Sequence, residues 1–226
     1  PMPTAVEIEF ENVIARGHVS VLNLRADQPV SFSWQNGLLA TTEPLLITRR
    51  GDGPAETGQL QFTIEHVTVV TQSGLCRMQY EGDATAHLPL DISASDSILV
   101  GPEDAALLEE TALDDFRPAR HRIRWNGSRN LYSGFDTFLR IRRLGSPDDL
   151  EEISWFRWDD YDGIWQENHE LHASVGWSRP MALTTPMQRH TPRDFLLDAE
   201  SPARNKAKDG NDLGFNYQAL PQLPLE

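Results

Sequence analysis

Large apolar residues alternate with polar ones in five short segments spread over the first 143 residues. The segments start at Val6, Val30, Leu60, Leu88 and His121. Side chains alternate across a β-strand, so this pattern predicts strands with one face buried and one face in water. The large apolar residues stand two and four positions after each start: Ile8 and Phe10, Phe32 and Trp34, Phe62 and Ile64, Leu90 and Ile92, Ile123 and Trp125.

The segments recur at a spacing that suits a stacked repeat. Their starts lie 24, 30, 28 and 33 residues apart, and a second apolar patch follows each first strand. Self-similarity at such a period is typical of solenoids. We therefore predict an all-β fold, a right-handed single-stranded parallel β-helix of about five rungs over residues 1–143. A β-sandwich or barrel is the alternative, but it would need tight hairpins every ~8 to 12 residues, and hairpin dipeptides are scarce here.

Polar residues stand six positions after the start in the first three segments. Asparagine tolerates the left-handed backbone conformation that a corner between strands requires. The fourth and fifth segments have Ala94 and Gly127 at this position, with Asp96 and Asn130 close by. We interpret the row as structural corners stacked on one another: Asn12, Asn36 and His66.

The chain changes character after residue 143. Asp149 is placed to cap a helix over residues 150–158, and the prolines at positions 180, 186, 192 and 202 prevent long regular elements. We expect residues 144–226 to form an irregular, partly helical C-terminal cap that packs its aromatic residues on the last rung.

Composition narrows the classes of function. The 226 residues are 39% hydrophobic and 24% charged, with a formal net charge of −14. Proteins neutralise nucleic acid and anionic membranes with Lys and Arg, so this balance argues against both as partners. No run approaches the ~18 apolar residues of a transmembrane helix.

The only cysteine, Cys76, alternates in phase with Met78 and Tyr80, which predicts a buried strand thiol. The single cysteine and the lack of a visible signal peptide favour a cytoplasmic location. The first strand begins almost at residue 1, and an uncovered first rung leaves a sheet edge open. We therefore expect a preceding domain of the same polypeptide, or another subunit, to cover that end.

Three strings could carry chemistry. His169 and His172, with Glu167 or His190, are the candidate zinc ligands, although the four-residue spacing of metalloproteases is missing and surface histidines are the favoured interpretation. Residues 209–212 are rich in oxygen ligands but also suit turns. A candidate ligand-binding platform, able to stack sugars and to hold calcium, comprises Trp158, Tyr161 and Trp165 with Asp159, Asp160 and Asp162.

Residues 8–13 (IEFENV), followed by a glycine and a β-run, resemble coils of the pectate-lyase-like parallel β-helix repeat proteins. Residues 34–39 (WQNGLL) and 125–130 (WNGSRN) resemble segments of large bacterial proteins. The closing residues 194–197 (DFLL), 201–203 (SPA), 209–210 (DG) and 212–214 (DLG) are similar to the end segment of many such repeats. The resemblance implies a β-helix, in some relatives downstream of a serine/threonine-kinase-like part. Enzymes of this class act on polysaccharides, but their aspartate cluster has no counterpart in register here.

Three hypotheses of function follow. The first is a non-catalytic scaffold or interaction domain of a larger bacterial protein, without a cofactor. The second is a carbohydrate-binding module or a degenerate polysaccharide lyase or hydrolase of the β-helix class. The third is a metal-dependent hydrolase built on His169 and His172.

Overall fold

The protein is an all-β molecule built from parallel strands that curl around one core. In the computed structural model the described residues are 5–25, 27–49, 58–79, 88–112, 122–143, 146–155, 165–179 and 185–221. Within these ranges no helix is long and apolar enough to cross a membrane.

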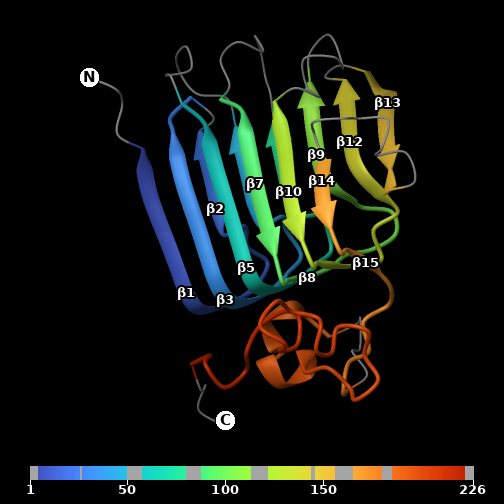
Figure 1. Ribbon diagram of the computed structural model, residues 1–226. Helices are drawn as coiled ribbons and strands as arrows, with labels where there is room; N and C mark the ends of the chain where they lie inside the picture. Colours follow the sequence, from blue (N-terminus) through green and yellow to red (C-terminus); the bar gives the residue numbers. More distant parts are fainter. Residues whose placement is uncertain are drawn as a thin grey trace.

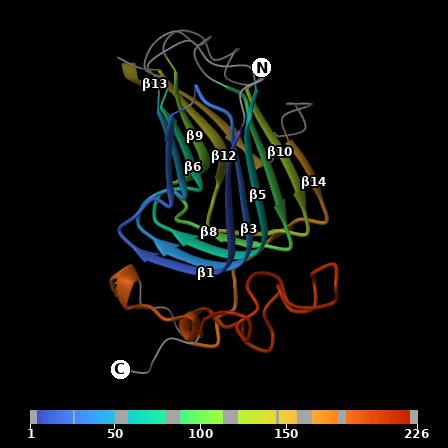
Figure 2. The same ribbon diagram turned by 90° about the vertical axis from the view of Figure 1, so that its left-hand side faces the viewer.

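Two sheets contain the strands (Figures 1 and 2). In the first sheet three 12-residue strands are followed by three pairs of shorter ones. They are β1 (Val6–Gly17), β3 (Val30–Thr41), β5 (Leu60–Thr71), β7 (Leu90–Ser95) with β8 (Ile98–Val100), β10 (Ile123–Ser128) with β11 (Leu131–Ser133), and β14 (Trp165–Asn168) with β15 (Leu171–His172). The second sheet contains β2 (Leu22–Arg25), β4 (Leu46–Arg49), β6 (Cys76–Gln79), β9 (Ala106–Ala112), β12 (Thr137–Arg143) and β13 (Ser146–Ser154).

Successive passes of the chain stack in parallel register. We call one pass through the two sheets a rung: rungs 1 to 5 span residues 6–25, 30–49, 60–79, 90–112 and 123–143, and rung 6 comprises β14 and β15. Every strand pair is parallel except β12 with β13, which is antiparallel. The prediction of an all-β chain of parallel strands is confirmed, and a sixth pair of strands extends the stack beyond residue 143.

The stacking register differs from the predicted one in rungs 4 and 5. Ile8, Phe32 and Phe62 pair as predicted, but Phe62 pairs with Ile92, whereas Leu90 pairs with Leu60. The predicted starts at Leu88 and His121 are therefore two residues early, and the observed starts are Leu90 and Ile123. A shift of two residues keeps every side chain on the same face, so alternation alone cannot detect it.

The core lies between the two sheets and is continuous along the stack. Phe32 stacks on Phe62 with ring centroids 4.7 Å apart, and Trp125 stacks on Trp165 at 4.9 Å. Cys76 lies in this core, as predicted, and burial raises the pKa of its thiol.

Residues 150–154 belong to β13, so the helix predicted there is wrong. The strand pairs with β12, and the Arg140 guanidinium lies 2.7 Å from the Glu152 carboxylate across the pair. This long-range pairing overrides the local helix signal at Asp149. Beyond β13, Trp155 is buried, and its indole Nε1 donates a hydrogen bond to the carbonyl of Phe135 at 2.7 Å.

The C-terminal segment, residues 185–221, lies along the outer face of the first sheet rather than on the last rung alone (Figure 1). It contains two short 3-10 helices, η3 (Met187–Arg189) and η4 (Pro192–Phe195). Its apolar side chains cover outward residues of several rungs in two clusters. One cluster joins Leu38, Ala40 and Val70 to Met187, Phe195 and Leu220, and the other joins Ile98 and Leu131 to Ala203, Ala207 and Leu213.

Candidate functional site

A row of residues in left-handed conformation marks the bend in the first sheet. All six have φ between 49° and 62°, in the region that ordinary side chains rarely adopt. The corner predicted at Asn12, Asn36 and His66 is confirmed. Because rungs 4 and 5 start two residues later than predicted, their corner residues are Asp96 and Arg129, and His169 continues the row in rung 6. We call these six residues the corner row.

The corner row fastens the C-terminal segment to the sheet. Asn36 accepts a hydrogen bond at Oδ1 from the backbone N–H of Asn216, at 2.6 Å. The Asp96 carboxylate is buried and accepts bonds at Oδ1 from Arg129 Nε at 2.7 Å and from the Lys208 N–H at 3.0 Å. Charge-assisted bonds of this kind are among the stronger ones in proteins. The row thus holds the C-terminal segment against several rungs at once.

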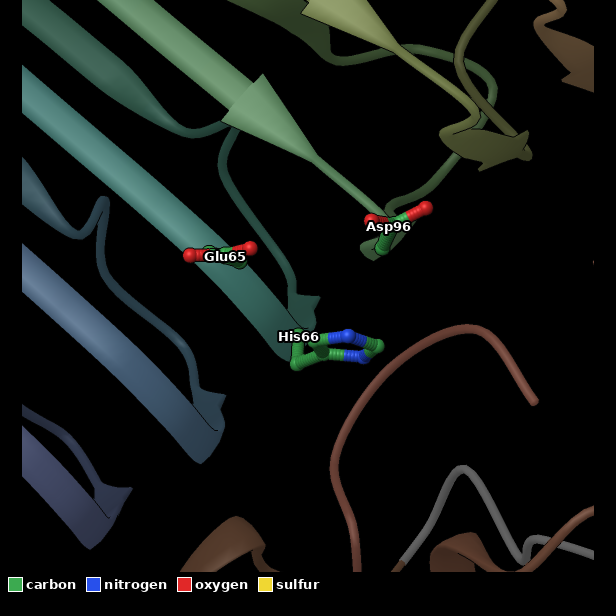
Figure 3. Close-up of side chains that lie close together, drawn as sticks. All are labelled: Glu65, His66 and Asp96. Atoms are coloured by element: carbon green, nitrogen blue, oxygen red, sulfur yellow. The ribbon is translucent and has the colours of Figure 1, made fainter. Parts of the chain in front are cut away.

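Within the corner row lies a group of side chains that together could hold a metal ion. Glu65, His66 and Asp96 each place a donor atom within 4.8 Å of the others; Glu65 and His66 lie within β5, and Asp96 directly follows the neighbouring strand β7 (Figure 3). A fourth group, the Asp209 carboxylate, lies 3.8 Å from His66 Nε2. Imidazole and carboxylate are suitable zinc ligands. Two of these side chains already interact with other residues: Arg129 neutralises the carboxylate of Asp96, and Asp209 faces the imidazole of His66.

A cleft of about 890 Å³ lies between the corner row and the C-terminal segment. Its walls carry amide and carboxylate side chains together with apolar ones, among them the rings of Phe195, Phe215 and Tyr217. This volume lies within the range of ligand-binding pockets in proteins, roughly 300–1,000 Å³. Residues that line the cleft include Asn12, Gln35, Asn36, His66, Asn211 and Gln218.

The structure places the predicted platform residues only in part. Trp165 is 4% exposed and stacks on Trp125, so its ring packs in the core and is not available to stack a sugar. Five of the six predicted residues lie outside the described ranges: Trp158, Asp159, Asp160, Tyr161 and Asp162.

The two histidines of the predicted zinc site, His169 and His172, are exposed and have different structural roles, while His190 is buried in the C-terminal segment. His169 is the corner residue of rung 6, while the imidazole of His172 stacks on Tyr132 with ring centroids 5.4 Å apart. Partial burial lowers the pKa of His172, with the nearby Glu170 carboxylate opposing the shift. Neither histidine belongs to the metal-capable group that the described residues contain.

Residues 209–212 form a turn stabilised by their own hydrogen bonds. Asp209 accepts bonds from the N–H of Asn211 at 3.0 Å and from its side-chain Nδ2 at 2.7 Å, which lower the pKa of Asp209. Asp212 accepts bonds from the N–H of Asn205 at 3.0 Å and from Arg204 Nη1 at 2.8 Å. These contacts support the interpretation as turn residues.

A largely buried carboxylate, that of Glu167, points into the core from rung 6, whereas the sequence indicated Glu167 only as a possible zinc ligand. Glu167 accepts hydrogen bonds from Trp125 Nε1 at 2.9 Å, from Asn130 Nδ2 at 2.9 Å and from the Tyr132 hydroxyl at 2.7 Å. Desolvation by burial nevertheless raises the pKa of Glu167 to about 7. The one sequence signal is Gly127, which pairs with Glu167 and leaves room for its side chain.

The two ends of the stack differ. At the rung 5 and rung 6 end, the rings of Trp155 and Trp165 cover the core. At the rung 1 end, β3 is the one strand that pairs with β1 within the described part of the chain, and β1 lies at the front in Figure 2. Ile8 and Phe10 are only partly buried, whereas their partner Phe32 and its neighbour Trp34 are 1% exposed. We call this surface, formed by β1 and the apolar side chains behind it, the open end.

In comparisons with known proteins, no family model, curated protein or solved structure matches the chain.

Proposed function

We propose that the chain is a right-handed, single-stranded parallel β-helix that serves as a non-catalytic scaffold or interaction domain. The parallel register of rungs 1 to 6 and the left-handed corner residues support the β-helix interpretation. The observation that carries the functional proposal is the open end. A row of inward apolar side chains that is buried in the other rungs is left partly exposed in rung 1.

The open end combines two features of a binding surface. Among the described residues, one edge of β1 has no partner strand, so in this proposal its backbone groups are available to a further strand. Behind that edge lie apolar side chains that a further rung would remove from water, at about 25 cal/mol per Å² of buried apolar area. The partner in this proposal is either a preceding domain of the same polypeptide or another subunit.

Exposure of this apolar surface can be tested with Nile red, an uncharged dye whose fluorescence rises at apolar surfaces. We expect the native chain to bind the dye and the double variant Ile8→Glu/Val13→Glu to lose most of the signal. Both residues are partly buried, so the variant should remain folded, which circular dichroism would check. Glu9→Gln, on the outward face of the same strand, is the matched control and should bind as the native chain does. Equal dye binding by the native chain and the double variant would contradict the proposed role of the open end.

The corner cleft favours a second candidate function, carbohydrate binding. Amide and carboxylate side chains next to an aromatic ring suit the hydroxyls and flat faces of sugars, and the cleft contains Tyr217 beside Asn36 and Asn211. On a glycan array this function predicts retention of at least one glycan class by the native chain and its loss in Tyr217→Ala. Trp177→Phe, outside the cleft lining, is the control. An array without any retained glycan would exclude the second function and leave the first untouched.

A further inference from the structure

We propose that the open end receives a parallel β-rung whose outward side chains are Lys or Arg opposite Glu7, Glu9 and Glu11, and whose corner residue is Asn or Asp opposite Asn12. This inference rests on the proposed function and deepens it, because it specifies the chemistry of the partner.

The charge of the partner follows from the outward face of β1. Glu7, Glu9 and Glu11 are all exposed and alternate with the inward Ile8 and Phe10. The rung 2 residues beside these glutamates carry no charge: Ser31, Ser33 and Gln35. None of the three glutamates forms an ion pair with another residue in the described part of the chain. A neighbouring strand on the open side is therefore the place from which cations would reach them.

Elsewhere in the protein, an outward glutamate forms ion pairs with arginines from both neighbouring strands. Glu109 of β9 lies between β6 and β12, and both neighbouring strands supply an arginine. Arg77 Nε lies 3.2 Å from one carboxylate oxygen of Glu109, and Arg142 Nε lies 2.9 Å from the other. Lateral neighbours in a sheet are close enough for opposite charges to stabilise the pairing. The glutamates of β1 have this arrangement on neither side.

The corner residue of the partner follows from the direction of the hydrogen bonds in the corner row. Asn36 Oδ1 accepts the Asn216 N–H, which fixes the orientation of the amide, and Asn36 Nδ2 then donates to Asn12 Oδ1 at 2.6 Å. This bond directs Asn12 Oδ1 toward rung 2, and it leaves Asn12 Nδ2, which makes a long 3.5 Å hydrogen bond to Glu11 Oε1, as the donor for a further rung. An acceptor on the partner corner, as in Asn or Asp, continues the ladder and also tolerates the left-handed backbone.

A second copy of the chain does not meet these requirements. Two copies that meet at their open ends through a twofold axis present the same surface to each other. Glu7, Glu9 and Glu11 of one copy would then lie along the same glutamates of the other. Like charges directly opposite on neighbouring strands are destabilising. The partner is therefore a different segment, with cationic outward positions.

The proposal can be tested with two synthetic 12-residue peptides that have Val or Ile at alternate positions and Asn at the seventh. One peptide has Lys at the outward positions and the other has Glu. Binding is measured by fluorescence anisotropy at low salt, and hydrogen–deuterium exchange locates the bound peptide on β1. From three opposite-charge pairs we expect the Lys peptide to bind about tenfold more tightly than the Glu peptide. The preference should reverse in the triple variant Glu7→Lys/Glu9→Lys/Glu11→Lys.

Two further controls separate specific pairing from general attraction to an acidic protein. A peptide of the same composition with a scrambled order should bind more weakly than the Lys peptide, and equal binding would overturn the proposal. Changing the Asn of the Lys peptide to Ala should weaken binding about threefold, as expected for the loss of one hydrogen bond of modest net strength.

The results of these binding experiments distinguish a failure of the charge inference from a failure of the proposed function of the open end. If both alternating peptides bind equally and protect β1 from exchange, the open end remains an interaction surface and the charge inference is wrong. If neither alternating peptide binds or protects β1, the proposed function of the open end fails together with the inference.

Discussion

Replacing Trp125 by alanine is expected to lower the free energy of unfolding by about 3–5 kcal/mol, the range for truncating a large buried aromatic residue. Trp125 is fully buried, and its ring stacks on Trp165 and meets Phe138 edge-on at 6.4 Å. Its indole N–H also donates to the Glu167 carboxylate. The substitution therefore leaves a cavity and removes a hydrogen bond from a buried acceptor. Urea denaturation followed by circular dichroism would measure the loss.

Two controls place this loss at the buried end of the stack. Trp125→Phe keeps an aromatic ring in the core and removes the donor to Glu167, so it should cost clearly less than Trp125→Ala. Phe10→Ala truncates an aromatic residue at the open end, where the ring is only partly buried. It should also cost clearly less, because part of that ring is in contact with water in the folded protein already. Equal losses for Trp125→Ala and Phe10→Ala would contradict the difference between the two ends.

The residues that face the core could be predicted from the sequence, because the alternation of apolar and polar residues depends only on neighbours within one strand. The stacking offset could not, since Leu88 and Leu90 are both apolar and both lie on the inward side of the alternation. The choice between them depends on which residue stacks on Leu60, a contact across about 30 residues. This choice also determines which residue forms the corner of rung 4. The corner residue is Asp96 and not Ala94, so the predicted row has no break there. Asp96 accepts hydrogen bonds from both Arg129 and Lys208.

The sequence contains a signal that the outer face of the first sheet is covered, but the search for alternating apolar and polar residues does not detect it. Residues 38–40 are Leu, Leu and Ala, and Val69 and Val70 are adjacent in rung 3, so both faces of these strands are apolar. Strands buried on both faces have continuous apolar runs. The outward members, Leu38, Ala40 and Val70, are the residues that the C-terminal segment covers. Their pattern thus indicates a covered outer face, although it does not identify the covering segment.

The aromatic platform and the buried carboxylate show why burial is difficult to predict from composition. Trp165 and Glu167 stand two residues apart on one strand, so they share a face, and that face is the core side. The aspartates and aromatic residues before Trp165 were compatible both with a ligand-binding platform and with packing on the last rung. A strand face that buries Trp165 also buries Glu167, and the carboxylate is tolerated there because Trp125, Asn130 and Tyr132 all donate to it.

Raising the pH from 5 to 8 is expected to destabilise the protein through two buried carboxylates. Burial raises the pKa of Glu167 to about 7, and it raises that of Glu110 to about 7 although the Arg122 guanidinium opposes the shift. Both groups bind a proton more tightly in the folded protein than in the unfolded chain, where the pKa is near 4.5. Their stabilising contribution is therefore complete below about pH 4.5 and is lost as the pH rises through about 7. By the linkage relation each carboxylate accounts for about 3 kcal/mol at most.

The double variant Glu110→Gln/Glu167→Gln isolates this effect, because glutamine resembles the protonated acid in shape and carries no charge. Denaturation midpoints at pH 5, 6, 7 and 8 should fall with pH in the native chain and stay nearly level in the variant. Surface groups titrate equally in both proteins, so the difference between the two curves reports the buried pair alone. The single variant Glu167→Gln should remove about half of the slope, since the two carboxylates lie in different sheets, where Glu110 faces Arg122 and Glu167 accepts bonds from Trp125, Asn130 and Tyr132. A double variant whose stability falls with pH as steeply as that of the native chain would show that neither carboxylate holds its proton in the folded state, and that ionised glutamate is stable in this core.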